Sequence, residues 1–130
     1  MSNYKTSDYI IGVVRSLLGA ITVPKYLTTK PTDAVTVEYV VINSLPINAD
    51  VMQKCYVNVN YHVKDLGEGI KDSVKLEAGS VTVLSILKHY TDLAIPPKYM
   101  IDFENQETIR EDALGEHFSN LRFSFKFINN

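Results

Sequence analysis

Tryptophan is absent from this 130-residue sequence, cysteine occurs once, and long apolar runs are missing. A lone cysteine, Cys55, excludes an internal disulfide and a multi-cysteine zinc site. Because no motif surrounds it, we interpret it as a small buried strand residue. The apolar stretch 10–21 is interrupted by Arg15 and falls short of the roughly 18 residues of a membrane span. The N-terminus lacks the features of a secretory signal, so we expect a protein made in the cytoplasm that does not enter membranes.

A surplus of either charge is also missing, since 13 Lys and Arg face 15 Asp and Glu, a net charge of −2. This balance argues against nucleic acid as a partner, because such proteins depend on contacts with phosphates. The charges are unevenly placed: six acids and one Arg give residues 102–116 a charge of −5, and four bases and one acid give residues 1–30 a charge of +3. Two interpretations stay open, namely complementary contacts between subunits and two solvated faces.

Motifs of known chemistry are missing too. The histidines His62, His89 and His117 do not have a metal-binding spacing, so we expect neither a metal nor another cofactor. The segment 67–69, Gly-Glu-Gly, lacks the remainder of a phosphate loop, and no Gly-x-Ser-x-Gly elbow exists. His62 and Asp65 resemble an acid–base pair, but a strand and the loop after it bring such residues together by chance. We therefore expect a protein that is not an enzyme.

Apolar residues at helical spacing predict two helices. The first is capped by Ser7 and ends at Gly19, and the second begins at Asp72 or Ser73 and runs to about Tyr90. Five segments predict strands because they alternate or are rich in β-branched and aromatic residues. They are Lys25 to Thr29, Val35 to Ile42, Gln53 to Val63, Tyr99 to Glu107 and Phe118 to Ile128. The acidic segment 107–115 is predicted to be a loop.

The predicted order is α-β-β-β-α-β-β in one domain, residues 1–130. We expect an α+β fold: a mostly antiparallel, mixed sheet of about five strands with both helices packed on one face. Alternation directs polar side chains toward the other face. That face is suited either to protein contacts or simply to water. Our candidate interface consists of Asn58, Asn60, His62, Arg122 and Lys126, together with the loop from Asn43 to Lys54.

Three stretches carry a resemblance to a known family: Thr36 to Asn43 (TVEYVVIN), Gln53 to Val63 (QKCYVNVNYHV) and Glu116 to Phe127 (EHFSNLRFSFKF). Together they resemble the tail completion, or tail terminator, proteins of the head-to-tail junction of tailed phages and prophages. The resemblance implies a structural virion protein that assembles into a homo-oligomeric ring, often a hexamer, which caps the tail tube and joins tail to head. Its implied partners are itself, the tail tube protein and the neck or connector proteins. It implies assembly in the host cytoplasm and a place in the virion tail and neck.

Two other classes of function stay open. The first is an α+β domain that binds a small molecule or a peptide on its polar sheet face, and the second is an enzyme whose site has no recognisable motif. Ligand binding predicts a deep cavity around His62 and Tyr61. Ring assembly predicts broad, shallow surfaces and an exposed loop arm.

Overall fold

A computed structural model describes residues 6–27, 37–45 and 54–127 of the chain. The elements are α1 (Ser7–Leu17), β1 (Lys25–Leu27), β2 (Glu38–Ser44), β3 (Lys54–Lys64), α2 (Ser73–Leu87), β4 (His89–Thr91), β5 (Tyr99–Glu111), the 3-10 turn η1 (Asp112–Leu114) and β6 (Glu116–Phe127). The predicted order is confirmed, with β4 as an additional strand. The predicted loop from Asn43 to Lys54 is wrong at its ends, because Asn43 and Ser44 belong to β2 and Lys54 belongs to β3. Residues 46–53 of this loop lie outside the described residues.

Both helices begin at side-chain caps. The hydroxyl of Thr6 accepts a hydrogen bond from the Tyr9 N–H at 3.3 Å, so the first helix is capped one residue before the predicted Ser7. The Asp72 carboxylate accepts from the Lys75 N–H at 3.2 Å, as predicted for the second helix. Such caps satisfy amide groups that lack a partner within the helix.

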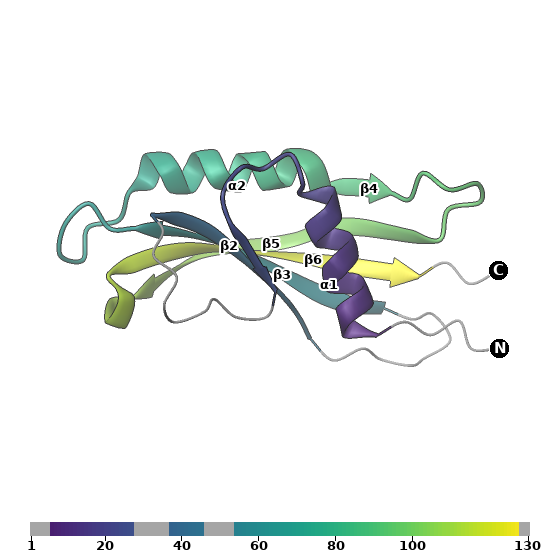
Figure 1. Ribbon diagram of the computed structural model, residues 1–130, viewed down its shortest axis with the longest axis horizontal. Coiled ribbons are helices and arrows are strands. Elements are labelled where there is room, and N and C mark those ends of the chain that lie inside the picture. The colour runs from purple at the N-terminus through teal and green to yellow at the C-terminus, as the bar shows by residue number, and fades with distance from the viewer. Residues whose placement is uncertain (1–5, 28–36, 46–53, 128–130) are drawn as a thin grey trace.

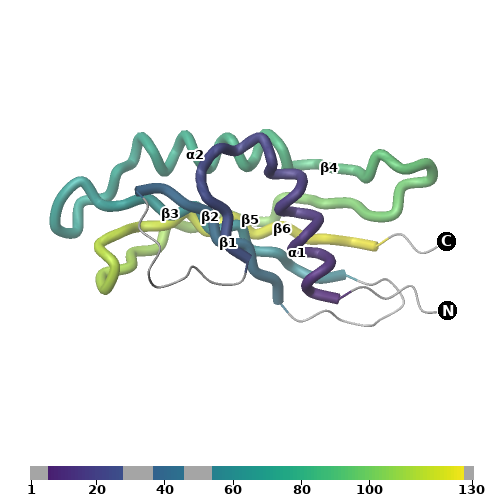
Figure 2. Tube along the Cα trace, viewed as in Figure 1, coloured from purple at the N-terminus to yellow at the C-terminus, as the bar shows by residue number. Residues whose placement is uncertain are grey.

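The six strands form one sheet in the order β1-β2-β3-β6-β5-β4, in which only the β1–β2 pair is parallel. Both helices lie on one face of this sheet, with α1 crossing the strands and α2 running along them (Figure 1). The tube view shows the same two layers (Figure 2). The predicted α+β class and the packing of both helices on one face are therefore confirmed.

The core lies between the helices and the sheet. Alternation along β3 points Val57, Val59, Tyr61 and Val63 toward the helices, and alternation along β6 points a matching apolar set the same way. These inward-facing residues of β6 are Leu121, Phe123, Phe125 and Phe127. The predicted faces of both strands are confirmed, and burial of these side chains supplies the main stabilising term.

Three boundaries in the second half of the chain differ from the prediction. Strand β6 begins at Glu116 instead of Phe118. Helix α2 ends at Leu87 instead of Tyr90, because Tyr90 belongs to β4 and pairs with Ile101. Strand β5 continues to Glu111 instead of ending at Glu107, because it keeps pairing with β6 as far as Glu111 opposite Glu116. A bulge between Phe103 and Asn105 shifts the register on the way. Ladder hydrogen bonds to β6 thus outweigh the low strand propensity of the acidic residues.

Candidate functional site

The five predicted interface residues all lie on the sheet face opposite the helices, which we call the far face. Asn58 pairs with Arg122 across β3 and β6, and His62 pairs with Phe118. Lys126 lies opposite Lys54 at the other end of the same two strands. Directly paired residues point to the same side of a sheet, so these side chains share one face as the alternation predicted.

A ladder of amide side chains crosses this face. The Asn58 Nδ2 donates to Asn43 Oδ1 at 3.0 Å, and the Arg122 Nε donates to Asn58 Oδ1 at 3.3 Å. One rung further along, the Asn120 Nδ2 donates to Asn60 Oδ1 at 2.6 Å. Asn58 lies on this polar face but is only 8% exposed. Buried polar groups need partners, and this amide has them on both neighbouring strands.

His62 is held within an aromatic stack on the far face. Its ring lies between Tyr39 at 4.5 Å and Phe118 at 4.6 Å between ring centres, with interplanar angles of 9° and 22°. The Glu116 Oε1 accepts from His62 Nδ1 at 2.9 Å and also from the Tyr39 hydroxyl. Burial, followed by the hydrogen bond to Glu116, raises the pKa of Tyr39 above its ordinary value. His62 is itself buried, with 7% of its surface exposed.

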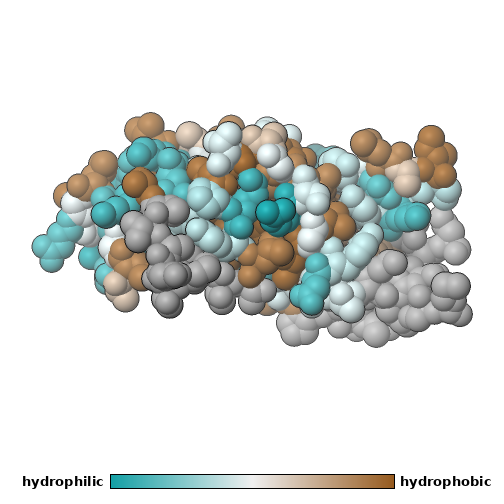
Figure 3. All heavy atoms as spheres, viewed as in Figure 1, coloured by the Kyte–Doolittle hydropathy of each residue, from teal (hydrophilic) through white to brown (hydrophobic). Residues whose placement is uncertain are grey.

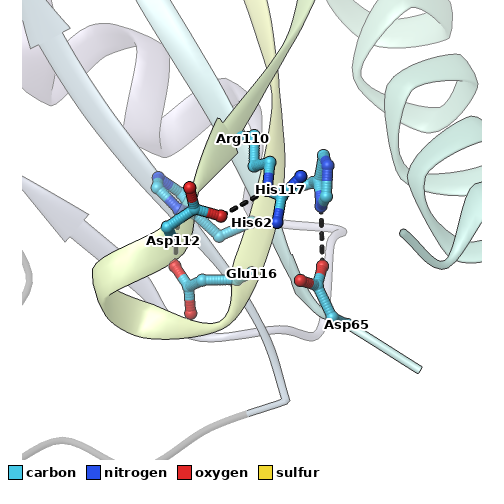
Figure 4. A network of polar contacts seen from close by, with 6 residues as sticks. All are labelled: His62, Asp65, Arg110, Asp112, Glu116 and His117. Carbon is cyan, nitrogen blue, oxygen red and sulfur yellow. Dashed lines mark hydrogen bonds and ion pairs between the residues drawn. The ribbon is translucent and has the colours of Figure 1, made fainter. Parts of the chain in front are cut away.

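A second histidine–carboxylate pair lies nearby. The His117 Nδ1 lies 2.7 Å from Asp65 Oδ1, and both side chains are largely buried. Figure 4 shows this pair and the His62–Glu116 pair at the same end of the sheet. The conceivable His62–Asp65 acid–base pair is not formed, because each of these residues pairs with a member of β6 instead.

Cys55 lies far along β3 from His62, opposite Phe125. It is 2% exposed, which confirms that it is a buried strand residue. Burial raises the pKa of its thiol to about 11, so near neutral pH it is not the thiolate that a nucleophile requires.

Three clefts lie among the described residues. One of about 500 Å³ lies between the β3–α2 connection and Arg110, whose guanidinium packs against Gly69. A cleft of about 230 Å³ is lined by Tyr61. Another of about 260 Å³ lies between α2 and the second half of β5, at Gln106 and Thr108. His62 lines none of these three, so they do not form the cavity that ligand binding predicted around His62 and Tyr61.

Within the described part of the chain, no group of three or more His, Cys, Asp or Glu side chains could hold a metal ion. The described helices are also too short or too polar to cross a membrane. No family model matches the sequence. No curated protein is significantly similar to it.

Sequence reasoning missed Tyr39 and Glu116, the two residues that complete the His62 cluster. Alternation predicts the face of each strand, but it does not predict which strands are neighbours. Tyr39 and Glu116 are 77 residues apart, and they meet only because β3 lies between β2 and β6. No local signal could have indicated this contact.

Proposed function

We propose that this chain is a structural virion protein of a tailed phage or prophage, without enzymatic activity. In this proposal its copies form a ring, often a hexamer, that caps the tail tube and joins the tail to the head. The ring contacts the tail tube protein and the neck or connector proteins. It assembles in the host cytoplasm and remains in the virion.

The exposed loop between β4 and β5 is the observation that carries this proposal. Its large apolar side chains Leu93 and Ile95 are 83% and 98% exposed. Figure 3 shows hydrophobic residues at the tip of this loop, which extends beyond the adjoining part of the sheet. Apolar side chains on a projecting arm are suited to burial against another protein. An arm of this kind is what ring assembly and tube capping predict.

The positions of the three resembling stretches also support the proposal. Apart from residues outside the described ranges, these stretches fall mainly on β2, β3 and β6, which are adjacent at the centre of the sheet. The resemblance therefore falls on one contiguous unit of structure rather than on scattered segments.

Sedimentation velocity at micromolar concentration, with and without tail tubes purified from the same phage, tests the proposal. We expect rings that sediment with the tubes, and electron microscopy should place them at one tube end. A chain that remains monomeric in the presence of tubes would contradict capping.

A pair of variants tests the arm directly. Replacing Leu93 and Ile95 together by Ser should weaken binding to tubes at least tenfold while the thermal unfolding curve stays unchanged. The matched control is Leu66→Ser, because Leu66 is also highly exposed at 71% but follows β3 at the opposite end of the sheet. Equal tube binding by the arm variant and the control would remove the arm from the proposed contact.

A further inference from the structure

Strand β5 has an outer edge that is only partly covered. β4 pairs with Met100 to Asp102, and the Phe103 N–H donates to the Lys88 carbonyl. Among the described residues, no strand pairs with this edge beyond Phe103. Since ladder bonds alternate along a strand, the register with β6 directs the main-chain groups of Gln106, Thr108 and Arg110 outward. An open edge of this kind is a template for another strand.

A groove accompanies this open edge on the helix side. The cleft of about 260 Å³ between α2 and β5 is bordered by Val81 and Leu84 of the helix and by Gln106 and Thr108 of the strand. Val81 is 52% exposed. A strand added at the edge would direct every second side chain toward this groove.

The strand at the opposite edge of the sheet, β1, lies at the same position along the strand direction, or level, as the open part of β5. Tyr26 of β1 pairs with Val41 of β2, which pairs with Asn60 of β3. Asn60 pairs with Asn120 of β6, which pairs with Glu107 of β5. β4 lies at a different level, because its Tyr90 pairs with Ile101. A second copy displaced sideways along the sheet would therefore bring its β1 beside residues 106–108, without meeting β4.

The direction and the exposed groups of β1 fit this position. β1 is parallel to β2, and tracing the antiparallel pairs across the sheet makes it antiparallel to β5. The Val40 N–H donates to the Pro24 carbonyl at 2.9 Å, so Pro24 faces β2 and alternation turns the main chain of Lys25 and Leu27 outward. The outward groups of Lys25 and Leu27 would then meet those of Thr108 and Gln106.

We propose that β1 of one copy pairs antiparallel with residues 106–108 of β5 in the next copy, so that the sheet continues from subunit to subunit. This inference rests on the proposed ring and names its subunit contact. The contact is heterologous, since two different edges meet, and such contacts generate rings when the rotation closes.

Side chains and charge support a second copy as the occupant of the edge. Leu27 is 45% exposed and lies on the helix side of the sheet, level with Gln106, so it would enter the groove beside Val81 and Leu84. Residues 104–111 hold three Glu and one Arg, a charge of −2, whereas β1 holds Lys25 and no acidic residue. Opposite charges on the two edges favour their approach and disfavour pairing of two β5 edges.

Proline at position 108 tests the pairing. Thr108→Pro removes an outward N–H that the β5–β6 ladder does not use, and proline is tolerated on edge strands. We expect self-association at least tenfold weaker than in Thr108→Val, which loses the same hydroxyl but keeps the N–H. Equal association by two folded variants would overturn the inference.

Cysteine crosslinking provides a measurement that does not depend on the proline variant folding. Tyr26→Cys combined with Glu107→Cys should give a ladder of disulfide-linked multimers on mild oxidation, because directly opposed strand residues lie within disulfide reach. The control pairs Tyr26→Cys with Met100→Cys, which lies where β4 covers the edge. Rings that form without the 26–107 crosslink would overturn this contact and leave the ring standing. A chain that never associates, even with tubes, would overturn both proposals.

Discussion

Glu116 joins two buried groups on the far face, since its carboxylate accepts from both His62 and the Tyr39 hydroxyl. Glu116→Ala leaves these two polar groups without that acceptor, and an unsatisfied buried group costs about 1 to 3 kcal/mol. We expect the free energy of unfolding to fall by about 2 to 6 kcal/mol for the two groups together. Urea denaturation followed by circular dichroism measures the loss.

Asp112→Ala is the matched control at the same end of the sheet. Asp112 is likewise a carboxylate with a side-chain partner, Arg110, but their side chains are 75% and 55% exposed. Exposed ion pairs contribute about 0 to 1 kcal/mol, so this variant should unfold close to the wild-type midpoint. Equal free energies of unfolding for Glu116→Ala and Asp112→Ala would show that the His62 cluster does not stabilise the fold.

For single residues, the sequence predicted which face of the sheet a side chain lies on, but it did not predict whether that side chain is buried. Alternation placed Asn58 and His62 on the correct face, but it could not show that both are buried. Burial depends on neighbouring side chains such as Tyr39 and Phe118, which strand pairing brings in from distant parts of the chain. A polar residue on a strand therefore indicates its face without indicating its access to water.

Helix α2 approaches the sheet closely at one glycine. A Cβ added to Gly79 would lie 2.3 Å from the Tyr61 ring, and the Tyr61 hydroxyl is bonded to Glu38 at 2.9 Å. Helix propensity alone would make Gly79→Ala stabilising by about 1 kcal/mol. Overpacking costs about 1 to 3 kcal/mol, so we expect a net loss of stability and a lower thermal midpoint.

Gly12→Ala is the control for this prediction because Gly12 lies inside α1 with open space around its would-be Cβ. Here only the helix propensity acts, so the variant should gain up to about 1 kcal/mol. The two glycine variants should thus shift the midpoint in opposite directions. A gain at both positions would mean that α2 does not pack against Tyr61 as described.

Among the elements, β4 and the end of β5, beyond Glu107, were not predicted, because neither has a pattern that indicates a strand. The alternating aromatic residues of β6 predict a strand by themselves. The second half of β5 is rich in Glu and is a strand only because β6 pairs with it, and β4 has three residues, too few to show a period. Tertiary pairing therefore determined what local propensity left undecided.

For the whole molecule, alternation and helical spacing predict an α+β domain with one covered sheet face, which the structure confirms. The strand order β1-β2-β3-β6-β5-β4 could not be predicted. It places the last strand, β6, between β3 and β5, and no local pattern specifies which strand fills that position. The proposed subunit contact requires β1 and residues 106–108 of β5 to lie at the same position along the strand direction. This alignment follows from the strand order and the register.

Buried tyrosines across the sheet make the stability of the molecule sensitive to alkaline pH. Burial, followed in each case by a hydrogen bond to a carboxylate, raises the pKa of Tyr39 and of Tyr61 above the ordinary value. Burial and the neighbouring Tyr90 raise the pKa of Tyr99 to about 12. The folded chain therefore keeps these protons after the unfolded chain has begun to release them at a pH of about 10. Unfolding releases protons in this range, so stability falls as the pH rises.

We expect the urea midpoint to be steady from pH 7 to 9 and to fall progressively above a pH of about 10. Tyr39→Phe should start with a lower midpoint, because it loses the hydrogen bond to Glu116, yet decline less steeply between pH 10 and 11.5 than wild type. That difference in slope isolates one tyrosine from the lysines, which also titrate near this pH. Identical slopes in the two proteins would show that the Tyr39 hydroxyl is not kept protonated by the fold, and would count against its buried contact with Glu116.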